Sequence, residues 1–78
     1  MDKKVFIYST PTCPYCIRAK QFLSENKITF TNYDVSGDHE KAEEMIQKSG
    51  QMGVPVLDIG GEIIVGFDRE KIKQTLGL

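Results

Sequence analysis

Two cysteines, Cys13 and Cys16, flank two residues in the segment Thr12-Cys13-Pro14-Tyr15-Cys16. The segment follows an apolar run and precedes a helical pattern, which places Cys13 at the expected N-cap of a helix. Free backbone N–H groups and the helix dipole favour an anion there, so we expect the pKa of Cys13 to lie below the free value of about 8.5. Because the thiolate is the nucleophile in disulfide exchange, Cys13 is a candidate attacking thiol.

Cys16 lies one helical turn further along the chain, within reach of the Cys13 sulfur, and we expect it to be more deeply buried. It therefore suits a resolving role, in which it attacks the mixed disulfide formed by Cys13 and releases the reduced substrate. Pro14 and Tyr15 stiffen the turn between the two thiols.

Two other interpretations of the cysteine pair are weaker. A C-x-x-C pair can be half of a zinc site, but zinc takes four ligands and His39 is the only histidine, near the start of the expected second helix. We expect His39 to be a solvated polar residue and predict no metal site. A structural disulfide closing so short a loop would contribute little stability, and a reducing cytoplasm would open it.

A second signal is Gly53-Val54-Pro55, which precedes an expected strand. Beside a redox-active pair it predicts a cis Val54–Pro55 bond that turns the backbone of Val54 outward next to the cysteines. The N–H and C=O groups of Val54 would then pair with an extended substrate, as an added strand does.

A third signal is Val65-Gly66-Phe67-Asp68. Gly66 permits a positive φ angle or a close backbone approach, and the N–H groups near Phe67 and Asp68 begin the last expected helix, where a carboxylate would bind. The alternative, that Gly66 only ends a strand and Asp68 only caps a helix, explains the residue pattern equally well.

These segments are expected to lie on seven elements, in the order strand, helix, strand, helix, strand, strand, helix. The first strand is predicted over residues 5–8, and the first helix begins at Pro14 and ends at Asn26 in a left-handed conformation. The second strand is predicted over 28–33. Asp38 caps the second helix, which Gly50 ends, and Asp68 caps the last helix with Ile72 and Leu76 on its apolar side.

Gly60-Gly61, between residues 56–59 and 62–65, predicts a tight hairpin. The strand–helix–strand opening implies a right-handed parallel crossover, to which the hairpin adds two antiparallel strands. The predicted fold is α/β: a four-stranded mixed sheet flanked by three helices, the minimal thioredoxin-like architecture, as a single domain over residues 1–78.

The charge is nearly balanced, with 10 Lys and Arg against 11 Asp and Glu, so no basic stripe indicates nucleic-acid binding. The apolar run at residues 5–8 is too short for a signal peptide or membrane span, so we expect no membrane partner and a cytoplasmic location. A monomer is the default expectation for the oligomeric state. Arg18 is expected to add modest positive potential near Cys13. Lys20 is interpreted as a solvated residue, and Asp58, in an apolar strand, is assigned no role.

The cysteine segment and its companions resemble glutaredoxins. Cys13-Pro14-Tyr15-Cys16 is identical to the dithiol glutaredoxin signature, Gly53-Val54-Pro55 resembles the family's Thr-Val-Pro segment, and Val65-Gly66-Phe67-Asp68 resembles its Gly-Gly-Cys-Asp segment. The order and spacing match over nearly the whole chain, most closely the small bacterial glutaredoxin-like proteins. The resemblance implies a thiol–disulfide oxidoreductase that uses glutathione as co-substrate to reduce protein disulfides and glutathione mixed disulfides.

The resemblance also implies a glutathione site. Val54 would pair with the tripeptide backbone, Phe67 and Asp68 would bind the γ-glutamyl carboxylate, and Gln51 would reach the glycine carboxylate. The full set of positions where family members hold glutathione is Tyr15, Gln51, Val54, Pro55, Gly66, Phe67 and Asp68.

Several residues depart from the family pattern. Thr10 stands where most members carry Lys or Arg, which implies weaker glutathione binding, while Gly53 replaces the usual Thr and Val65 the first Gly. Val65-Gly66-Phe67 is also similar to the redoxins that serve ribonucleotide reductase and take electrons from thioredoxin reductase, which is the alternative donor. A third alternative, an iron–sulfur cluster carrier, ranks lower because Pro14-Tyr15 resembles the members that hold no cluster.

Overall fold

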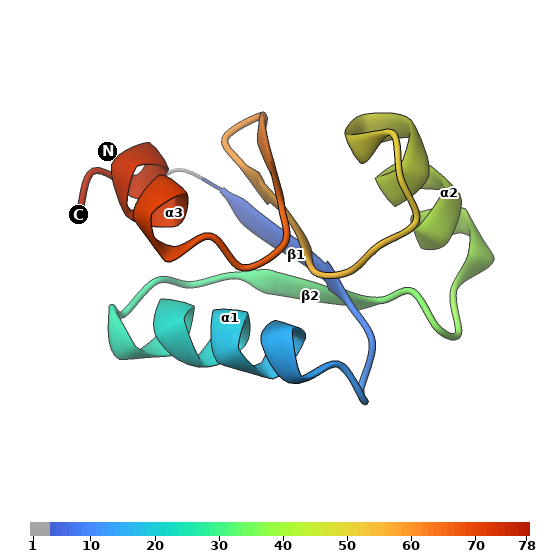
Figure 1. The fold of residues 1–78 in the computed structure, drawn as a ribbon, viewed down its shortest axis with the longest axis horizontal. Coiled ribbons are helices and arrows are strands. Elements are labelled where there is room, and N and C mark those ends of the chain that lie inside the picture. The colour runs from blue at the N-terminus through green and yellow to red at the C-terminus, as the bar shows by residue number, and fades with distance from the viewer. Residues whose placement is uncertain (1–3) are drawn as a thin grey trace.

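The structure, a computed structural model, describes residues 4–78. Its seven elements follow the predicted order (Figure 1). Their bounds are β1 Val5–Ser9, α1 Pro14–Glu25, β2 Thr31–Asp34, α2 His39–Ser49, β3 Val56–Ile59, β4 Glu62–Val65 and α3 Arg69–Leu76.

The four strands form one mixed sheet in the order β2-β1-β3-β4. Strand β1 pairs in parallel with β2, with Phe6 opposite Thr31, and antiparallel with β3, with Tyr8 opposite Val56. The β3–β4 hairpin is antiparallel and turns at Gly60 and Gly61, whose φ angles of 58° and 97° suit the primed turns of tight hairpins. The predicted fold class is confirmed.

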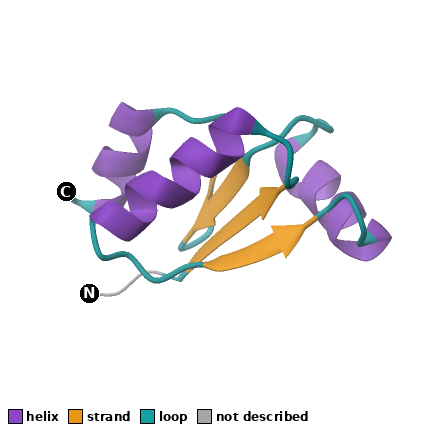
Figure 2. Ribbon diagram, turned by 90° about the horizontal axis from the view of Figure 1, so that it is seen from below, coloured by secondary structure: helices purple, strands orange, loops and turns teal. Residues whose placement is uncertain are grey.

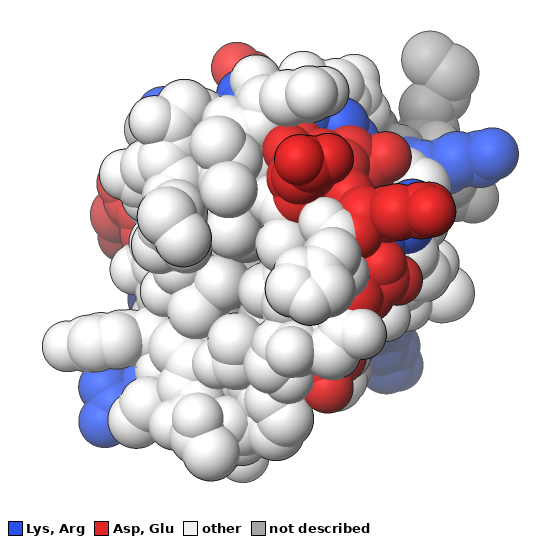
Figure 3. Space-filling model, turned by 90° about the vertical axis from the view of Figure 1, so that its right-hand side faces the viewer, with Lys and Arg blue, Asp and Glu red and all other residues white. Residues whose placement is uncertain are grey.

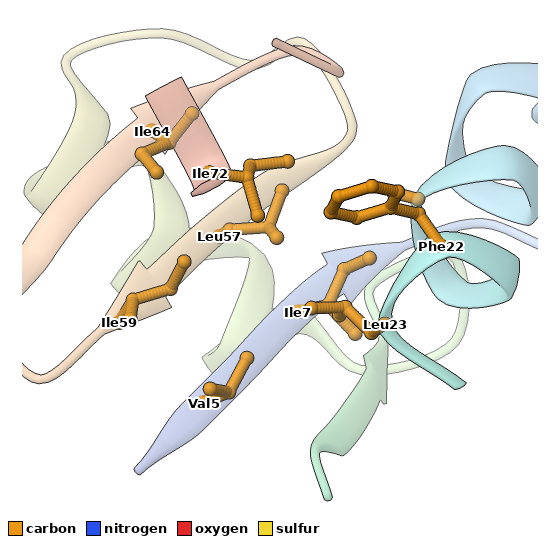
Figure 4. Packing of buried hydrophobic residues seen from close by; sticks show 9 residues of the cluster. Val5, Ile7, Phe22, Leu23, Leu57, Ile59, Ile64 and Ile72 are labelled. Atoms are coloured by element: carbon orange, nitrogen blue, oxygen red, sulfur yellow. The ribbon is translucent and has the colours of Figure 1, made fainter. Parts of the chain in front are cut away.

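Alternating strand residues divide the core into two layers, because successive side chains point to opposite faces of a sheet. Ile7 and Leu57 face α1 and α3, whereas Tyr8 and Val56 face Met45 of α2. Figure 2 shows two helices together over one face of the strands and the third apart from them. Figure 4 shows the larger layer, in which side chains from β1, β3, β4 and α3 meet those of α1.

Helix α1 begins as predicted at Pro14 and its last residue is Glu25, but the left-handed residue that follows it lies one position later than expected. Asn26 has a φ of −92°, and the left-handed residue is Lys27, with a φ of 59°. The Asn26 side chain instead donates to the carbonyl of Phe22 at 2.8 Å. The turn at Lys27 lets the N–H of Ile28 bond to the Leu23 carbonyl, so that Ile28 packs against the core.

Strand β2 is shorter than the predicted range 28–33 and lies over Thr31–Asp34. Its partner β1 begins only at Val5, and the parallel register sets Phe6 opposite Thr31. Residues 28–30 therefore precede the region of pairing, and the side chains of Ile28 and Phe30 pack on the α1 layer.

The other helix boundaries agree with the predicted signals. Asp38 caps α2 by accepting from the N–H of Lys41 at 3.1 Å, and Gly50 ends the helix with a φ of 76°. Asp68 caps α3 by accepting from the N–H of Lys71 at 3.1 Å. Over residues 4–78, none of the helices combines the length and the apolar character that crossing a membrane requires.

Candidate active site

Cys13 lies at the junction between the turn after β1 and the first turn of α1. It is the N-cap residue, and its Sγ accepts a hydrogen bond from the backbone N–H of Cys16 at 3.3 Å. The Cys13 thiol also donates to the carbonyl oxygen of Val54 at 3.8 Å, across a sequence separation of 41 residues. Both cysteines are free thiols, so this geometry is that of the reduced pair.

The surroundings of Cys13 favour its thiolate. Burial by itself raises the pKa of this thiol, but hydrogen bonds from the side chain and backbone of Cys16 and from the backbone of Tyr15 lower it. The positive charge of Lys20 acts in the same direction, and the pKa of Cys13 is lowered overall. This is the direction expected for a thiol at a helix N-terminus, where backbone donors are free.

Cys16 has the opposite character. It is fully buried, and burial, followed by its hydrogen bond with Cys13, raises its pKa to about 11. At neutral pH the pair therefore holds one thiol disposed to ionise and one that stays protonated. This asymmetry is what an attacking and a resolving thiol require.

Lys20 is the cation that acts on the cysteine pair, which corrects the expectation for Arg18. Arg18 is exposed, and its guanidinium lies 5.7 Å from the centroid of the Tyr15 ring, whereas Lys20 is half-buried and lowers the pKa of both Cys13 and Cys16. Cys13, Cys16 and Lys20 are spaced by three and four residues, so they share one face of α1. That spacing was the available signal in the sequence.

Replacing Lys20 by glutamine is expected to slow alkylation of Cys13 by iodoacetamide at pH 7. The thiolate is present above the pKa of Cys13 and lost as the pH falls through it, so removing a stabilising cation moves the rate profile to higher pH. A charge acting through several ångströms of partly solvated protein changes such a rate by about two- to threefold. Arg18→Gln removes the same charge from the same helix and is expected to leave the profile unchanged. Equal effects of the two substitutions would contradict the assignment.

The segment opposite Cys13 contains the predicted cis Val54–Pro55 bond. The carbonyl of Pro55 accepts a hydrogen bond from the N–H of Gly66 at 2.8 Å, and Gly66 has a φ of 79°. This bond brings the chain that leaves β4 beside Pro55. Gly66 thus adopts the positive φ that the sequence pattern allows at this position, and its backbone also approaches Pro55.

The other residues of the predicted glutathione site differ in how far their side chains are exposed. Tyr15 is 58% exposed, and Gln51 is exposed with its Nε2 close to Gly53, where an added Cβ would lie 3.2 Å from that nitrogen. Phe67 follows Gly66, but its ring is half-buried and packs edge-on against Phe22. Direct contacts or chain adjacency thus link Cys13, Cys16, Val54, Pro55 and Gly66, whereas the half-buried Phe67 ring packs against the core.

His39 is the first residue of α2 and is exposed. In the part of the chain that the structure describes, no three or more His, Cys, Asp or Glu side chains are grouped so as to hold a metal ion.

The sequence was compared with known families and proteins. The glutaredoxin family model matches residues 5–64. The chain belongs to the glutaredoxin family. A Clostridium pasteurianum protein described as an uncharacterized glutaredoxin-like 8.6 kDa protein in the rubredoxin operon is 46% identical over 70 residues, covering 90% of this chain and 93% of that protein. Glutaredoxin 3 of Escherichia coli strain K12 is 44% identical over 64 residues, covering 82% of this chain and 77% of the relative.

A solved structure agrees with this membership. The crystal structure of the thioredoxin-like protein BC3987 superimposes with a TM-score of 0.88 at 32% identity, covering 94% of this chain and 100% of that chain. This glutaredoxin therefore has the thioredoxin-like fold that its element order predicts. Members of the family are thiol–disulfide oxidoreductases, and so is this protein.

Proposed function

We propose that this glutaredoxin reduces protein disulfides and glutathione mixed disulfides, that Cys13 is its attacking thiol and Cys16 its resolving thiol, and that glutathione supplies the electrons. The observation that carries the proposal is the asymmetry of the pair. Cys13 is accessible, caps α1 and has a lowered pKa, whereas Cys16 is buried and has a pKa of about 11.

In the first step the Cys13 thiolate attacks one sulfur of a substrate disulfide. A bond forms between that sulfur and Cys13 Sγ, the substrate S–S bond breaks, and the other sulfur leaves as a thiolate that takes a proton from water. In the dithiol route Cys16 then loses its proton and attacks Cys13 Sγ, which releases the first substrate sulfur and leaves a Cys13–Cys16 disulfide. Two glutathione molecules reduce that disulfide and become one oxidised glutathione.

In the monothiol route Cys13 takes only the glutathione from a mixed disulfide, and the substrate thiol leaves. A second glutathione thiolate then attacks the glutathione sulfur bound to Cys13, and oxidised glutathione is released as the Cys13 thiolate is restored. Cys16 takes no part in this route.

Substrate would bind on the backbone of Val54, beside Cys13. The Cys13–Val54 contact of 3.8 Å supports this position, because a peptide paired with Val54 would bring its sulfur close to the thiolate. Tyr15, Gln51, Pro55 and Gly66 would form the walls of the glutathione site. The N–H groups at Phe67 and Asp68 would bind a carboxylate at the start of α3, where the helix dipole favours negative charge.

Thioredoxin reductase is the alternative donor. Position 10 is occupied by Thr10, which supplies no cation to pair with a glutathione carboxylate. Met52, in the segment before Val54, is 78% exposed. An exposed Met is typical of protein–protein interfaces, in which this residue type is enriched. Figure 3 shows that acidic side chains gather along one side of the α2 end and that much of the remaining face is uncharged.

A paired reduction assay distinguishes the two donors. The oxidised protein is offered glutathione with glutathione reductase in one arm and thioredoxin reductase in the other, and NADPH consumption is followed in both. Rapid turnover with glutathione supports the proposal. Turnover in the thioredoxin reductase arm alone would keep the disulfide chemistry and reassign the donor. We place both reactions in the cytoplasm, where free thiols persist.

A further inference from the structure

Lys48 connects the end of α2 to the sheet through a small polar network. Its Nζ donates to Asp58 Oδ2 at 2.8 Å and to the Tyr8 hydroxyl at 3.0 Å. The Tyr8 hydroxyl in turn donates to the Glu44 carboxylate, and Glu44 lies 3.9 Å from Lys48 Nζ. Asp58 is a carboxylate on the otherwise apolar strand β3, and its sequence neighbours indicate no role for it.

The network is more tightly held than an ordinary surface ion pair. The Asp58 side chain is only 11% exposed, and its second oxygen, Oδ1, accepts from the N–H of Gly61 at 3.0 Å. Tyr8 is fully buried between α2 and the sheet. Hydrogen bonds to Asp58 and then to Tyr8 raise the pKa of Lys48, which favours its charged form. Exposed pairs contribute little, but this one has both partners fixed by further bonds.

Lys48 and Asp58 lie on either side of the segment that contains Val54. Lys48 lies two residues before Gly50, which ends α2, and Asp58 lies on β3 three residues after Pro55. The ion pair therefore joins two residues that are ten positions apart in the chain, and the Val54 segment forms the loop between them. Within that loop the carbonyls of Val54 and Pro55 accept from the Cys13 thiol and the Gly66 N–H, and the contacts nearer α2 are local, such as Ser49 Oγ with the backbone of Gln51.

We infer that the Lys48–Asp58 ion pair is a clasp that holds residues 50–55 in place, so that the Val54 backbone faces Cys13 and binds extended substrate. Both residues are positioning residues and touch no substrate. The inference rests on the proposed role of Val54 in substrate binding. It deepens that proposal by assigning the placement of the binding backbone to side chains on the opposite face of the sheet from α1.

Two variants test the clasp by kinetics. Lys48→Gln removes the cation, and Asp58→Asn removes the charge while an oxygen remains to accept from Gly61. With a glutathionylated peptide, glutathione and glutathione reductase, we expect KM to rise about fivefold or more in both variants, with kcat within about twofold of wild type. Iodoacetamide alkylation of Cys13 is expected to keep its wild-type rate, because the small reagent does not use Val54.

Two controls separate positioning from charge and from general stability. Lys41→Gln removes a cation from the same helix and breaks the Lys41–Glu44 pair of 3.5 Å, but leaves the clasp intact, so KM is expected to stay at the wild-type value. Lys48→Arg keeps the cation and is expected to restore most of the wild-type KM. An unchanged KM in folded Lys48→Gln and Asp58→Asn proteins, or an equal rise in Lys41→Gln, would overturn the inference.

Amide hydrogen exchange gives a second readout that needs no donor or substrate. Opening of the loop breaks the hydrogen bond from the Gly66 N–H to the Pro55 carbonyl, so we expect the Gly66 amide to exchange about tenfold faster in Lys48→Gln and Asp58→Asn than in Lys41→Gln. Equal exchange in all three would refute the clasp. If the wild-type protein does not turn over the glutathionylated peptide, the proposed function fails, whereas the exchange rates still decide whether the clasp exists.

Discussion

Replacing Cys13 by serine is expected to abolish every disulfide reaction of the protein, with a loss of about a thousandfold or more in rate. A serine hydroxyl does not ionise near neutral pH, so the hydrogen bond from the Cys16 N–H at 3.3 Å would have no anion to stabilise. Reduction of a protein disulfide and release of glutathione from a glutathionylated peptide are measured in parallel.

The substitution should leave the fold intact, because serine is itself a favoured N-cap residue for α1. An unchanged thermal unfolding midpoint shows that the loss of activity is chemical. Residual activity above about a tenth of wild type would mean that another group attacks the substrate, and would contradict the assignment of Cys13.

Replacing Cys16 by serine is expected to separate the two routes. Reduction of protein disulfides is expected to fall about a hundredfold or more, because no thiol remains to attack the mixed disulfide on Cys13. Release of glutathione from a glutathionylated peptide is expected to stay within about threefold of wild type, since a second glutathione resolves that intermediate. Rates with the two substrates at saturating glutathione give the comparison.

Complete loss of deglutathionylation in this variant would rule out the monothiol route. The interpretation depends on an intact site, which is tested by alkylation of Cys13. Cys16 also lowers the pKa of Cys13 through its side-chain and backbone hydrogen bonds, and the backbone bond survives in the serine variant. We therefore expect Cys13 to remain reactive at pH 7.

The parts of the fold that follow from local chemistry were predictable. Pro14, Asp38 and Asp68 begin helices because the first turn of a helix needs capping oxygens and tolerates a missing donor. The hairpin at Gly60-Gly61 was predictable because its tight turn requires positive φ angles, which glycine adopts readily. The left-handed turn at Lys27, after the end of α1, was not predictable, because it depends on where Ile28 reaches the core.

In the candidate site, too, features set by local chemistry were predictable and features set by packing were not. The roles proposed for Cys13 and Cys16 follow from one short segment and its position at a helix N-terminus. Which cation faces the thiols depends on how α1 is rotated against the sheet, and Lys20 rather than Arg18 faces them. The Lys48–Asp58 pair depends on the packing of α2 over β3, and no local pattern in either segment indicates it.

The most direct test of the account is the formation of a glutathione mixed disulfide on a single thiol. The Cys16→Ser and Cys13→Ser proteins are each mixed with oxidised glutathione at pH 7, and the intact mass of each is followed in time. We predict rapid addition of one glutathione to Cys16→Ser, through its Cys13, and no addition to Cys13→Ser on that timescale. Faster addition to Cys13→Ser, or none to Cys16→Ser, would contradict the assignment of Cys13 as the attacking thiol.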